Sequence, residues 1–530
     1  MPQLRPMLGV LVALVLPLCA VPAAAQQYDV IIRHGRVVDG TGNPWYYADV
    51  AVSGERIAAV GDLSRATAKR EVDATGLYVA PGFIDVHSHS GPGLATKALS
   101  PARPLVAQGI TTVFVNPDGG GPVDLAVQRA ELLKDGLGVN VAQLMPHGSV
   151  RRAVLGMADR APTPAELERM KGLVRKGMEE GAFGVSSGPF YAPGSYSKTD
   201  ELVELAKVAS AYGGAYTSHI RDESDYTVGL VAAVDEVITV AREAKLPGVV
   251  THIKALGPHV WGYSAAIVER IDRAREQGIQ VYADQYPYEA SGSSLTSSLI
   301  PRWAEVGGDS ALVRRLSTPA ELAKIHAAMV ENLDRRGGAD HLQFRRFVKD
   351  PSIEGKTLAA VAKERGVDPL ELAVELIKQG GAAMVSFNMN PRDVARFMRQ
   401  PWTMTSTDGD LVPMGEGVPH PRSYGTYPRK LRKYVVEDDV VDLAFAVRSM
   451  TSLPATVFGV ADRGQLRPGA FADVVVFDLA RVRDKADYQN PHQLAEGMVD
   501  VLVNGRFAMD GGRYTDELGG RVLQRRPPRT

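Results

Sequence analysis

The stretch that decides the fold runs from Pro81 to His89 and reads PGFIDVHSH. Its apolar first half is typical of a buried strand, and two histidines separated by one residue follow. Alternate residues of a strand face the same way, so both imidazoles can reach one metal ion. With 11 histidines in 530 residues, chance alone gives roughly 0.2 such pairs per chain. The pair therefore has to be judged by its surroundings.

Beyond this stretch the sequence alternates buried strands with amphipathic helices, which predicts an α/β fold with a parallel sheet. Helices are predicted over 163–180, 199–211, 227–244 and 265–277, the first with an N-cap motif at Thr163. Eight predicted strands are enough to close a TIM-like (β/α)8 barrel. They cover 82–86, 110–115, 184–186, 215–218, 248–251, 281–284, 383–386 and 403–406.

Polar residues follow several of these strands, at the barrel end where active sites lie. His219 follows 215–218, His252 follows 248–251, and Asp408 closes the strand at 403–406. A single strand-end histidine is more often a hydrogen-bonded structural residue than a ligand. Four histidines and an aspartate at one end of a barrel instead indicate a divalent metal site. Zinc is the first candidate, and iron, manganese and cobalt also suit these nitrogen and oxygen donors.

Both ends of the chain consist of short β-rich runs separated by turn residues. Residues 26–80 and 456–530 are predicted to form one small β-sandwich, which leaves 81–455 for the catalytic barrel. The region from about 297 to 382 is long and helical in pattern, so we expect a helical insertion in one strand-to-strand connection.

The first 25 residues have the order of a signal peptide: a basic residue, an apolar stretch, and small residues before a cut after Ala25. We therefore expect export to the periplasm or the medium. The alternative is an uncleaved anchor or a lipoprotein attached at Cys19, which the preceding Pro17 and Leu18 disfavour. Cleavage leaves a mature chain without cysteine.

The composition restricts the partners. The chain has 60 Lys and Arg against 61 Asp and Glu, a net charge of -1. It therefore has no overall positive charge that could bind nucleic acid or anionic lipid. With 45% hydrophobic and 23% charged residues, the chain has the composition of folded globular domains. We expect no nucleic-acid partner and, after signal cleavage, no membrane partner. One cysteine excludes a disulfide scaffold.

With its β-rich flanks, the PGFIDVHSH stretch resembles the amidohydrolase superfamily of metal-dependent hydrolases, as does GAFAD at 469–473. Four further segments resemble the N-acyl-D-amino-acid deacylases, or D-aminoacylases, within it. These segments are YTSHIRDE at 216–223, THIK at 251–254, DQYPYEAS at 284–291 and HPRSYGTYPR at 420–429. The resemblance spans essentially the whole mature chain.

The resemblance implies a function: hydrolysis of the linear amide bond of N-acyl-D-amino acids with one or two divalent ions. It assigns His87 and His89 to one metal position and His219 and His252 to the other, with Asp408 as the catalytic acid and base. The expected partner is therefore a small molecule with a free carboxylate, and homo-oligomers are an open possibility. The implied substrate-binding residues are Lys254 and Arg422, which would hold the α-carboxylate, assisted by Tyr286 and Ser293.

The chain departs from the family at one ligand. The D-aminoacylase pattern has a cysteine just after the second strand, where this chain reads VNPDGG at 115–120. Asp118 is the available substitute, since a carboxylate can bind or bridge divalent ions. The other interpretation is that Pro117 to Gly120 is only a turn, for which its composition is ideal, and that the site holds one ion. The strand at 184–186 offers no lysine that could bridge two ions instead.

Three other functions compete. Within the same superfamily, the substrate could be a cyclic amide or a dipeptide, as for the dihydroorotase-, hydantoinase- and isoaspartyl-dipeptidase-like branches. Gly184 to Gly188 matches G-x-S-x-G, the motif of a serine hydrolase, although an irregular PFYAPG run follows it where a helix is needed. An exported binding protein that has lost its metal is the third, and the four histidines and Asp408 argue against it.

Overall fold

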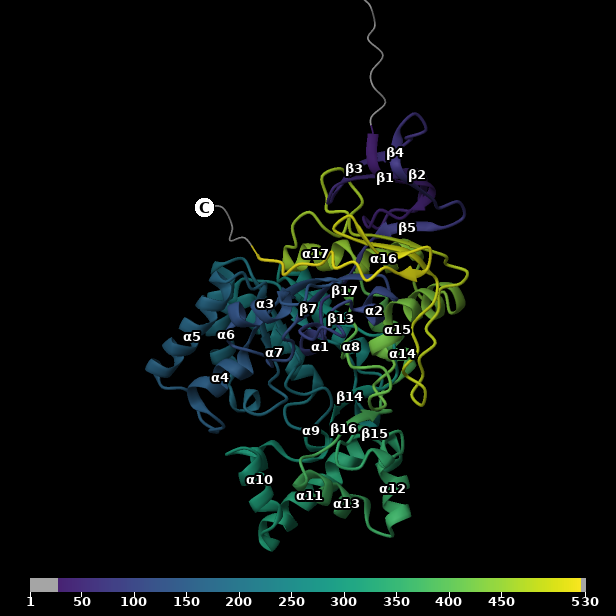
Figure 1. Cartoon of the computed structure of the whole chain (residues 1–530). Coiled ribbons are helices and arrows are strands. Elements are labelled where there is room, and N and C mark those ends of the chain that lie inside the picture. Colours follow the sequence, from purple (N-terminus) through teal and green to yellow (C-terminus); the bar gives the residue numbers. More distant parts are fainter. Residues whose placement is uncertain (1–26, 526–530) are drawn as a thin grey trace, which may run out of the picture.

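The centre of the molecule is a barrel of parallel strands, seen in a computed structural model that describes residues 27–525 (Figure 1). The predicted signal peptide at 1–25 lies outside the described residues. One arc of the barrel has the order β6-β7-β8, and the other the order β9-β10-β11-β12-β13-β17. The strands are β6 (Phe83–Asp85), β7 (Ile110–Val115), β8 (Asn140–Gln143), β9 (Met145–Pro146), β10 (Gly184–Ser187), β11 (Ala215–Ser218), β12 (Gly248–Val250), β13 (Val281–Gln285) and β17 (Thr403–Thr405).

Backbone hydrogen bonds join the two arcs at both seams. Phe183 N donates to Gln143 O at 2.9 Å between β8 and β10. At the other seam Asp408 N donates to His87 O at 2.8 Å, and His89 N donates to Gly409 O at 2.9 Å. The prediction of a TIM-like barrel is therefore confirmed.

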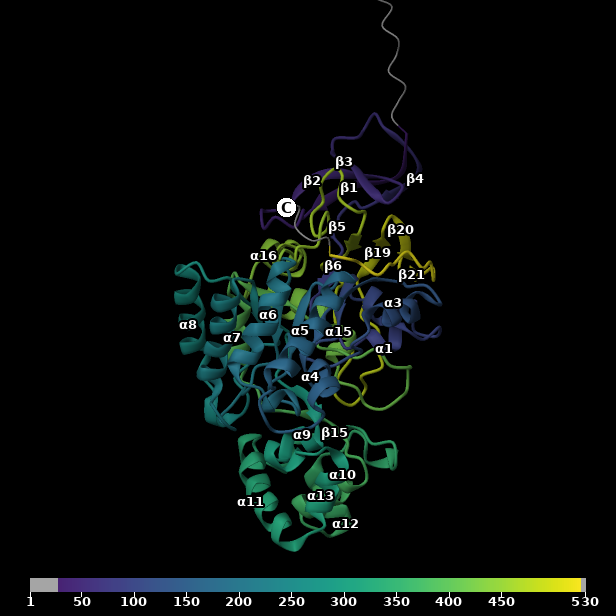
Figure 2. The ribbon, with the colours of Figure 1, turned by 90° about the vertical axis from the view of Figure 1, so that its left-hand side faces the viewer.

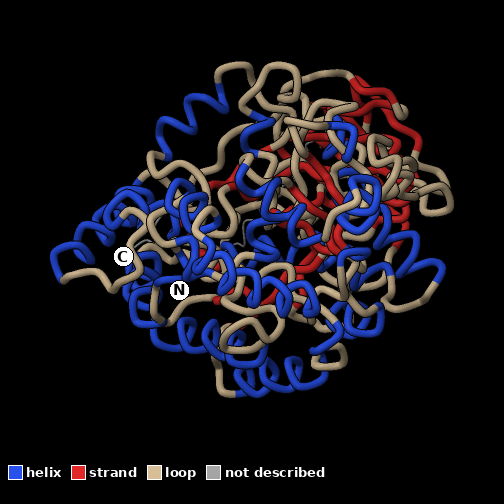
Figure 3. Tube along the Cα trace, turned by 90° about the horizontal axis from the view of Figure 1, so that it is seen from below, coloured by secondary structure: helices blue, strands red, loops and turns tan. Residues whose placement is uncertain are grey.

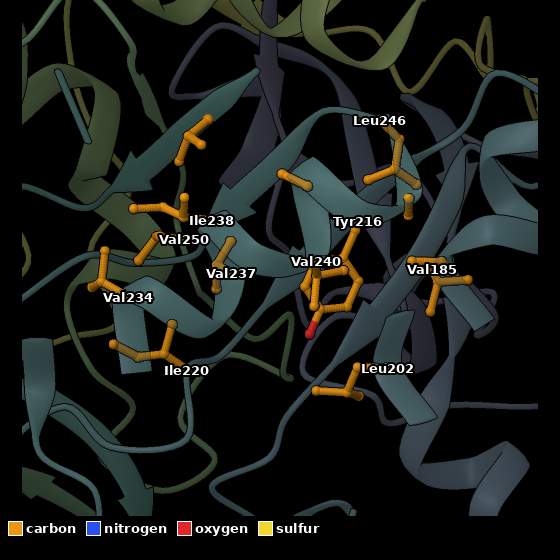
Figure 4. Packing of buried hydrophobic residues seen from close by; sticks show 14 of the residues in the cluster. Val185, Leu202, Tyr216, Ile220, Val234, Val237, Ile238, Val240, Leu246 and Val250 are labelled. Carbon is orange, nitrogen blue, oxygen red and sulfur yellow. The ribbon is translucent and has the colours of Figure 1, made fainter. Parts of the chain in front are cut away.

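Helices surround the strands, as the view from below shows (Figure 3). Val237 and Val240 of α7 pack with Leu202 of α6 against Val185 and Tyr216 of the strands (Figure 4). This burial of one apolar stripe per helix stabilises the outer layer. The four helices predicted here are α5 (Pro164–Glu179), α6 (Thr199–Ala211), α7 (Leu230–Ala244) and α8 (Ser264–Glu276).

The prediction that residues 383–386 form a barrel strand was wrong: they form a strand, but it lies outside the barrel. It is β16 (Ala383–Ser386), the middle strand of a three-stranded antiparallel sheet with β14 (Ser291–Ser294) and β15 (Leu342–Arg346). Its place in the barrel belongs to β8, where polar Asn140 and Gln143 interrupt the apolar pattern that marks a buried strand. Both side chains are buried and hydrogen-bonded, Asn140 Nδ2 to Thr111 O at 3.0 Å and Gln143 Nε2 to Leu125 O at 3.1 Å.

The insertion forms a lobe next to the barrel (Figures 1 and 2). It is mostly helical, as predicted, but it also contains β15 and has an apolar core of its own. The antiparallel sheet of β14, β15 and β16 links the lobe to the barrel. Its helices are α9 (Leu295–Leu299), α10 (Asp309–Leu316), α11 (Pro319–Arg335), α12 (Leu358–Arg365) and α13 (Pro369–Lys378).

Both chain ends build one small β domain, as predicted. A nine-stranded sheet runs in the order β21-β20-β19-β18-β5-β1-β2-β3, and β4 pairs with β1. The two ends of the chain join where β5 pairs antiparallel with β18. The strands are β1 (Gln27–Val37), β2 (Tyr46–Ser53), β3 (Arg56–Gly61), β4 (Thr67–Asp73), β5 (Tyr78–Pro81), β18 (Val474–Phe477), β19 (Met498–Val503), β20 (Arg506–Asp510) and β21 (Arg513–Tyr514).

Residues 520–525 leave the β domain and run along the barrel wall. Val522 forms a parallel bridge with Val141 of β8, flanked by hydrogen bonds from Val141 N to Arg521 O (2.9 Å) and from Leu523 N to Val141 O (2.7 Å). Arg525 N then donates to Gly181 O at 3.0 Å, just before β10. This segment therefore fills the gap between the amino ends of β8 and β10.

The remaining helices lie in the connections of the barrel and at its border with the β domain. Among residues 27–525, none of the helices has the length and apolar character needed to span a bilayer. These remaining helices are α1 (Gly91–Leu94), α2 (Arg103–Val106), α3 (Leu125–Leu133), α4 (His147–Leu155), α14 (Pro391–Met398), α15 (Arg422–Arg429), α16 (Leu443–Met450) and α17 (Ser452–Phe458).

Candidate metal centre and active site

Six ionisable side chains meet at the carboxyl ends of the barrel strands. Three of them have a left-handed backbone, with φ of 55° at Asp118, 37° at His252 and 47° at Asp408. Such a conformation costs a non-glycine residue about 1–3 kcal/mol and is concentrated at functional sites. Here it follows the strand ends and turns the side chains toward one another. The six residues are His87, His89, Asp118, His219, His252 and Asp408.

Asp118 lies at the centre of this group. Its Oδ1 is 3.3 Å from His87 Nε2, 3.5 Å from His252 Nε2 and 3.8 Å from His219 Nδ1, and its Oδ2 is 3.2 Å from His89 Nε2. Pro117 to Gly120 is indeed a turn, closed by Gly120 N and Pro117 O at 3.0 Å. The turn holds the carboxylate in contact with all four histidines.

Several of these buried ligand atoms have no hydrogen-bond partner of good geometry among the described residues. They are His87 Nε2, Asp118 Oδ1 and both ring nitrogens of His219. Buried polar atoms are normally hydrogen-bonded, and exceptions point to an ion, a water or a ligand. The candidate ligand atoms form two groups, one of His87, His89, Asp118 and Asp408 and one of Asp118, His219 and His252. The donor set thus fits divalent ions, with Asp118 common to both groups.

The protonation preferences of the histidines show how strongly the carboxylates draw positive charge into this site. Burial opposes a charged imidazole, but Asp118 and Asp408 raise the pKa of His89 to about 10. Burial and Lys254 also oppose a charged imidazole at His252, yet Glu223 and Asp408 raise the pKa of His252 to about 9. Burial lowers the pKa of His219 to about 3, so this imidazole is neutral and free to coordinate. A divalent cation would satisfy the same electrostatic demand.

Asp408 contacts both the histidines and the neighbouring cation. Its Oδ1 is 3.1 Å from His89 Nε2 and 3.5 Å from His87 Nε2, and its Oδ2 is 2.8 Å from Arg422 Nη1. Burial favours the neutral acid, but Arg422 and His252 outweigh burial and hold the pKa of Asp408 well below its usual range. The carboxylate is therefore ionised and can accept a proton.

Glu223 is a site residue that the sequence prediction missed. Its Oε1 is 2.5 Å from Lys254 Nζ and 3.1 Å from His252 Nδ1. A carboxylate that accepts the Nδ1 proton of a histidine leaves Nε2 free for a metal and orients the ring. The only signal was its position four residues after His219, inside a segment already quoted for its family resemblance.

Arg422 and Lys254 form the cationic side of the site. Both are buried and lie over the face of Tyr286, with Arg422 Cζ 4.7 Å and Lys254 Nζ 5.6 Å from the ring centroid. Arg422 Nε and Nη1 have no hydrogen-bond partner of good geometry among residues 27–525, and neither has Ser293 Oγ. The hydroxyl of Tyr286 donates to Met389 Sδ at 3.8 Å.

One cavity of about 410 Å³ joins these groups, a volume suited to a small molecule. The predicted site residues that line it are His89, Asp118, His219, His252, Lys254, Tyr286, Ser293, Asp408 and Arg422. His87 is buried and does not line the cavity, but its Nε2 contacts Asp118 Oδ1.

Two buried aspartates behind the cluster were also missed. Asp284, at β13, accepts hydrogen bonds from His252 N at 2.9 Å and Ser406 Oγ at 2.6 Å. Asp85, at β6, accepts from Thr407 Oγ1 at 2.6 Å and Thr407 N at 2.9 Å. They fix the strand ends that carry His252 and Asp408.

The serine-hydrolase alternative does not fit the geometry. Ser186 Oγ donates to Asn116 O at 2.5 Å, and the irregular residues 188–198 follow β10 before α6 begins. His147, another strand-end histidine, lies 2.8 Å from Glu201 Oε1 through its Nε2, and Arg151 also pairs with Glu201. His147 therefore belongs to a buried structural network.

The chain is similar to known proteins over most of its length. A model of the amidohydrolase family matches residues 70–509. The chain is 37% identical over 528 residues to an N-acyl-D-glutamate deacylase of Alcaligenes xylosoxydans xylosoxydans, covering 94% of this chain and 97% of that protein.

Two solved structures are similar over the same range. A crystal structure of an N-acyl-D-glutamate deacylase from Bordetella bronchiseptica, complexed with zinc and a phosphonate mimic of the tetrahedral intermediate, has a TM-score of 0.79 at 35% identity. A D-aminoacylase structure that defines a novel subset of amidohydrolases has a TM-score of 0.80 at 32% identity. Both matches cover 94% of this chain and 100% of the other.

Proposed function

The chain belongs to the amidohydrolase family, and on that premise we propose that it deacylates N-acyl-D-amino acids, with Asp118 as the ligand shared between two metal positions. The reaction adds water across a linear amide and releases a carboxylate and a D-amino acid. The observation that carries the proposal is the meeting of four histidines and two aspartates beside a pair of buried cations in one cavity.

Zinc is the proposed ion, because imidazole and carboxylate suit it and because the Bordetella relative contains it. Once bound, a divalent ion lowers the pKa of a coordinated water from about 15.7 to about 7 and polarises the substrate carbonyl. Glu223 supports the centre because its Oε1 lies 3.1 Å from His252 Nδ1 and pairs with Lys254, whose Nζ contacts the same ring nitrogen.

Asp408 is the proposed general base and acid. Its ionised carboxylate accepts a proton from the attacking water and later delivers it to the departing amine. Its Oδ1 lies against His89 and His87, while Arg422 holds Oδ2 at 2.8 Å. The carboxylate thus faces the metal ligands with one oxygen and the substrate-binding cation with the other.

Arg422 and Lys254 are proposed to bind the α-carboxylate of the substrate. The guanidinium has two donors, Nε and Nη1, without a good hydrogen bond among the described residues, and a planar fork suits a carboxylate. Lys254 lies two residues after His252, with its Nζ 2.7 Å from His252 Nδ1. This places the cation beside a metal ligand, where the free carboxylate of an N-acyl amino acid would lie. Ser293 Oγ, also in the cavity, is a further donor.

Export remains a proposal that rests on the first 25 residues. We expect the secreted or periplasmic protein to begin at Gln26. N-terminal sequencing of protein purified from a native host tests it, and a start at Met1 would contradict it.

The function is tested with matched N-acetyl-D- and N-acetyl-L-amino acids, each assayed before and after chelation. We expect the D series alone to be hydrolysed, activity to vanish on chelation, and zinc to restore it. Hydrolysis of the L series, or full activity in protein shown by metal analysis to be free of metal, would refute the proposal. Dihydrouracil and isoaspartyl dipeptides, included as substrates, test the cyclic-amide and dipeptide alternatives.

A further inference from the structure

Arg336 carries a buried charge for which the described protein provides no counter-ion. The residue follows α11 in the insertion lobe and is only 1% exposed. Its Nη1 donates to Ser386 Oγ at 3.0 Å, whereas its Nε has no partner. Within residues 27–525 no carboxylate lies within 4.0 Å of it.

The other buried arginines of the described chain differ in this respect. Arg151 pairs with Glu201, Arg422 with Asp408, and Arg463 with Asp473. A buried charge is strongly unfavourable unless it is paired, so an arginine without an acid indicates that an anion from outside the chain completes the site.

Arg336 lines the same cavity as the metal centre. Its partner Ser386 is the cross-strand neighbour of Ser291 on β14. The next residue of β14, Gly292, touches Arg422: a Cβ atom there would lie 3.0 Å from Arg422 Nη2. Two guanidinium groups therefore lie near the same part of β14. Arg422 lies next to Gly292 of β14, and Arg336 binds Ser386, which is paired with Ser291 of β14.

The two guanidinium groups differ in what they face. Arg422 lies against Asp408 and the metal ligands, where the α-carboxylate binds. Arg336 belongs to the lobe and lines the cavity wall together with Ser293, whose buried hydroxyl also lacks a hydrogen-bond partner among the described residues. Arg345 lines the cavity too, but Asp410 already pairs with it. Arg336 is thus the buried cation of this wall that is left for a second anionic group.

We infer that Arg336 determines specificity by binding a side-chain carboxylate, so that the preferred substrates are N-acyl derivatives of acidic D-amino acids. This inference rests on the proposed function. Two carboxylates on one substrate would then occupy the two guanidinium sites, the α-carboxylate at Arg422 and the side-chain carboxylate at Arg336. Losing one member of a buried charged pair leaves the other unpaired, which is why such a site rejects neutral isosteres strongly.

The test compares each acidic substrate with its neutral isostere: N-acetyl-D-glutamate with N-acetyl-D-glutamine, and N-acetyl-D-aspartate with N-acetyl-D-asparagine. In the wild-type protein we expect kcat/KM for the better acid to exceed that of its amide by about 100-fold or more. In Arg336→Gln we expect this ratio to fall at least tenfold, mostly through KM for the acid, with kcat/KM for the amides unchanged or raised. Which acid is better reports the length of side chain that the site accepts.

Arg152→Gln is the matched control, because it removes the same charge from an exposed residue of the same cavity. It should leave the acid-to-amide ratio within about twofold of the wild-type ratio. If Arg336→Gln does not fold, Arg336→Lys keeps the charge but loses the fork, and the wild-type ratio alone still tests the inference.

Equal losses for acids and amides in Arg336→Gln would overturn the specificity role and leave a structural one. A wild-type protein that hydrolyses neutral N-acyl-D-amino acids as well as acidic ones overturns this inference alone. A protein that hydrolyses no N-acyl-D-amino acid overturns the proposed function as well.

Discussion

Several buried polar atoms at the carboxyl ends of the barrel strands, among them both ring nitrogens of His219, have no hydrogen-bond partner within the described chain, whereas one group of buried side chains at the amino ends forms a closed network. At the amino ends, Asp473 pairs with Arg463, whose Nη2 donates to Asn504 Oδ1 at 2.7 Å. Asn504 Nδ2 donates to Asn140 Oδ1 at 2.8 Å, and Asn140 Nδ2 donates back to Asp473 Oδ2 at 3.2 Å. This closed network joins the β domain to the barrel.

Buried polar side chains therefore have two different roles in this barrel. A network whose donors and acceptors are matched fixes the structure. A cluster with backbone strain and buried atoms that lack hydrogen bonds is built for something outside the chain. Substitutions at the carboxyl ends should therefore change chemistry, and substitutions at the amino ends should change stability.

The largest effect is expected for Asp408→Asn. It removes the proton acceptor but keeps the size of the side chain, so kcat should fall by about 10³- to 10⁴-fold. Metal should remain bound, which mass spectrometry of the intact protein would check, and calorimetry would confirm that the variant is folded. A variant with substantial activity would refute the acid and base role.

Arg463→Ala tests the opposite end. It leaves Asp473 buried without its cation, which should reduce the free energy of unfolding by about 3–5 kcal/mol. Denaturant unfolding measures that loss, and the folded variant should retain wild-type kcat and metal content at low temperature. Lost activity in a fully folded variant would mean that the two ends are not independent.

A smaller effect is expected for Glu223→Gln, which weakens the orientation of His252 but removes no metal ligand. Metal affinity should fall by about 10- to 100-fold. Competition with a chromophoric chelator measures it. Asp225→Asn is the control, because Asp225 lies in the same loop as Glu223 but pairs with His259 and Arg335. Unchanged affinity in Glu223→Gln would remove its supporting role.

The smallest effect is expected for Asp118→Cys, which introduces the ligand of the related family. Both side chains are anionic ligands, so the metal should stay bound and kcat should remain within about tenfold. The affinity for zinc relative to manganese and cobalt should rise, because a thiolate is softer than a carboxylate. Equilibrium dialysis against paired metals would show it, and an unchanged metal preference would contradict a ligand role for Asp118.

Residues that end strands could be predicted from the sequence, because a strand-end position in a parallel barrel fixes where a side chain goes. That rule found His219, His252 and Asp408, and it gave Asp118 as a candidate despite its turn-like surroundings. It could not find Glu223, since its place beside Lys254 depends on how the loop after β11 folds back.

The barrel strands show the same limit. Seven of the eight predicted strands lie in the barrel, but β8 was missed because its polar residues Asn140 and Gln143 are satisfied by residues distant in sequence. Residues 383–386 were assigned to the barrel because a short apolar run predicts a strand without saying which strand it pairs with. Arg336 carried no sequence pattern at all, and only its burial without an acid sets it apart.

Residues 520–525 have a consequence for how the chain matures. They lie between β8 and β10, yet they are translated after every strand of the barrel and of the β domain. A chain emerging from the ribosome can therefore pair β6 with β7 and β8, but it cannot seal the wall next to β8 until synthesis has passed that segment. Final closure is thus a late event, and a chain carried across a membrane in an extended form would complete it on the far side.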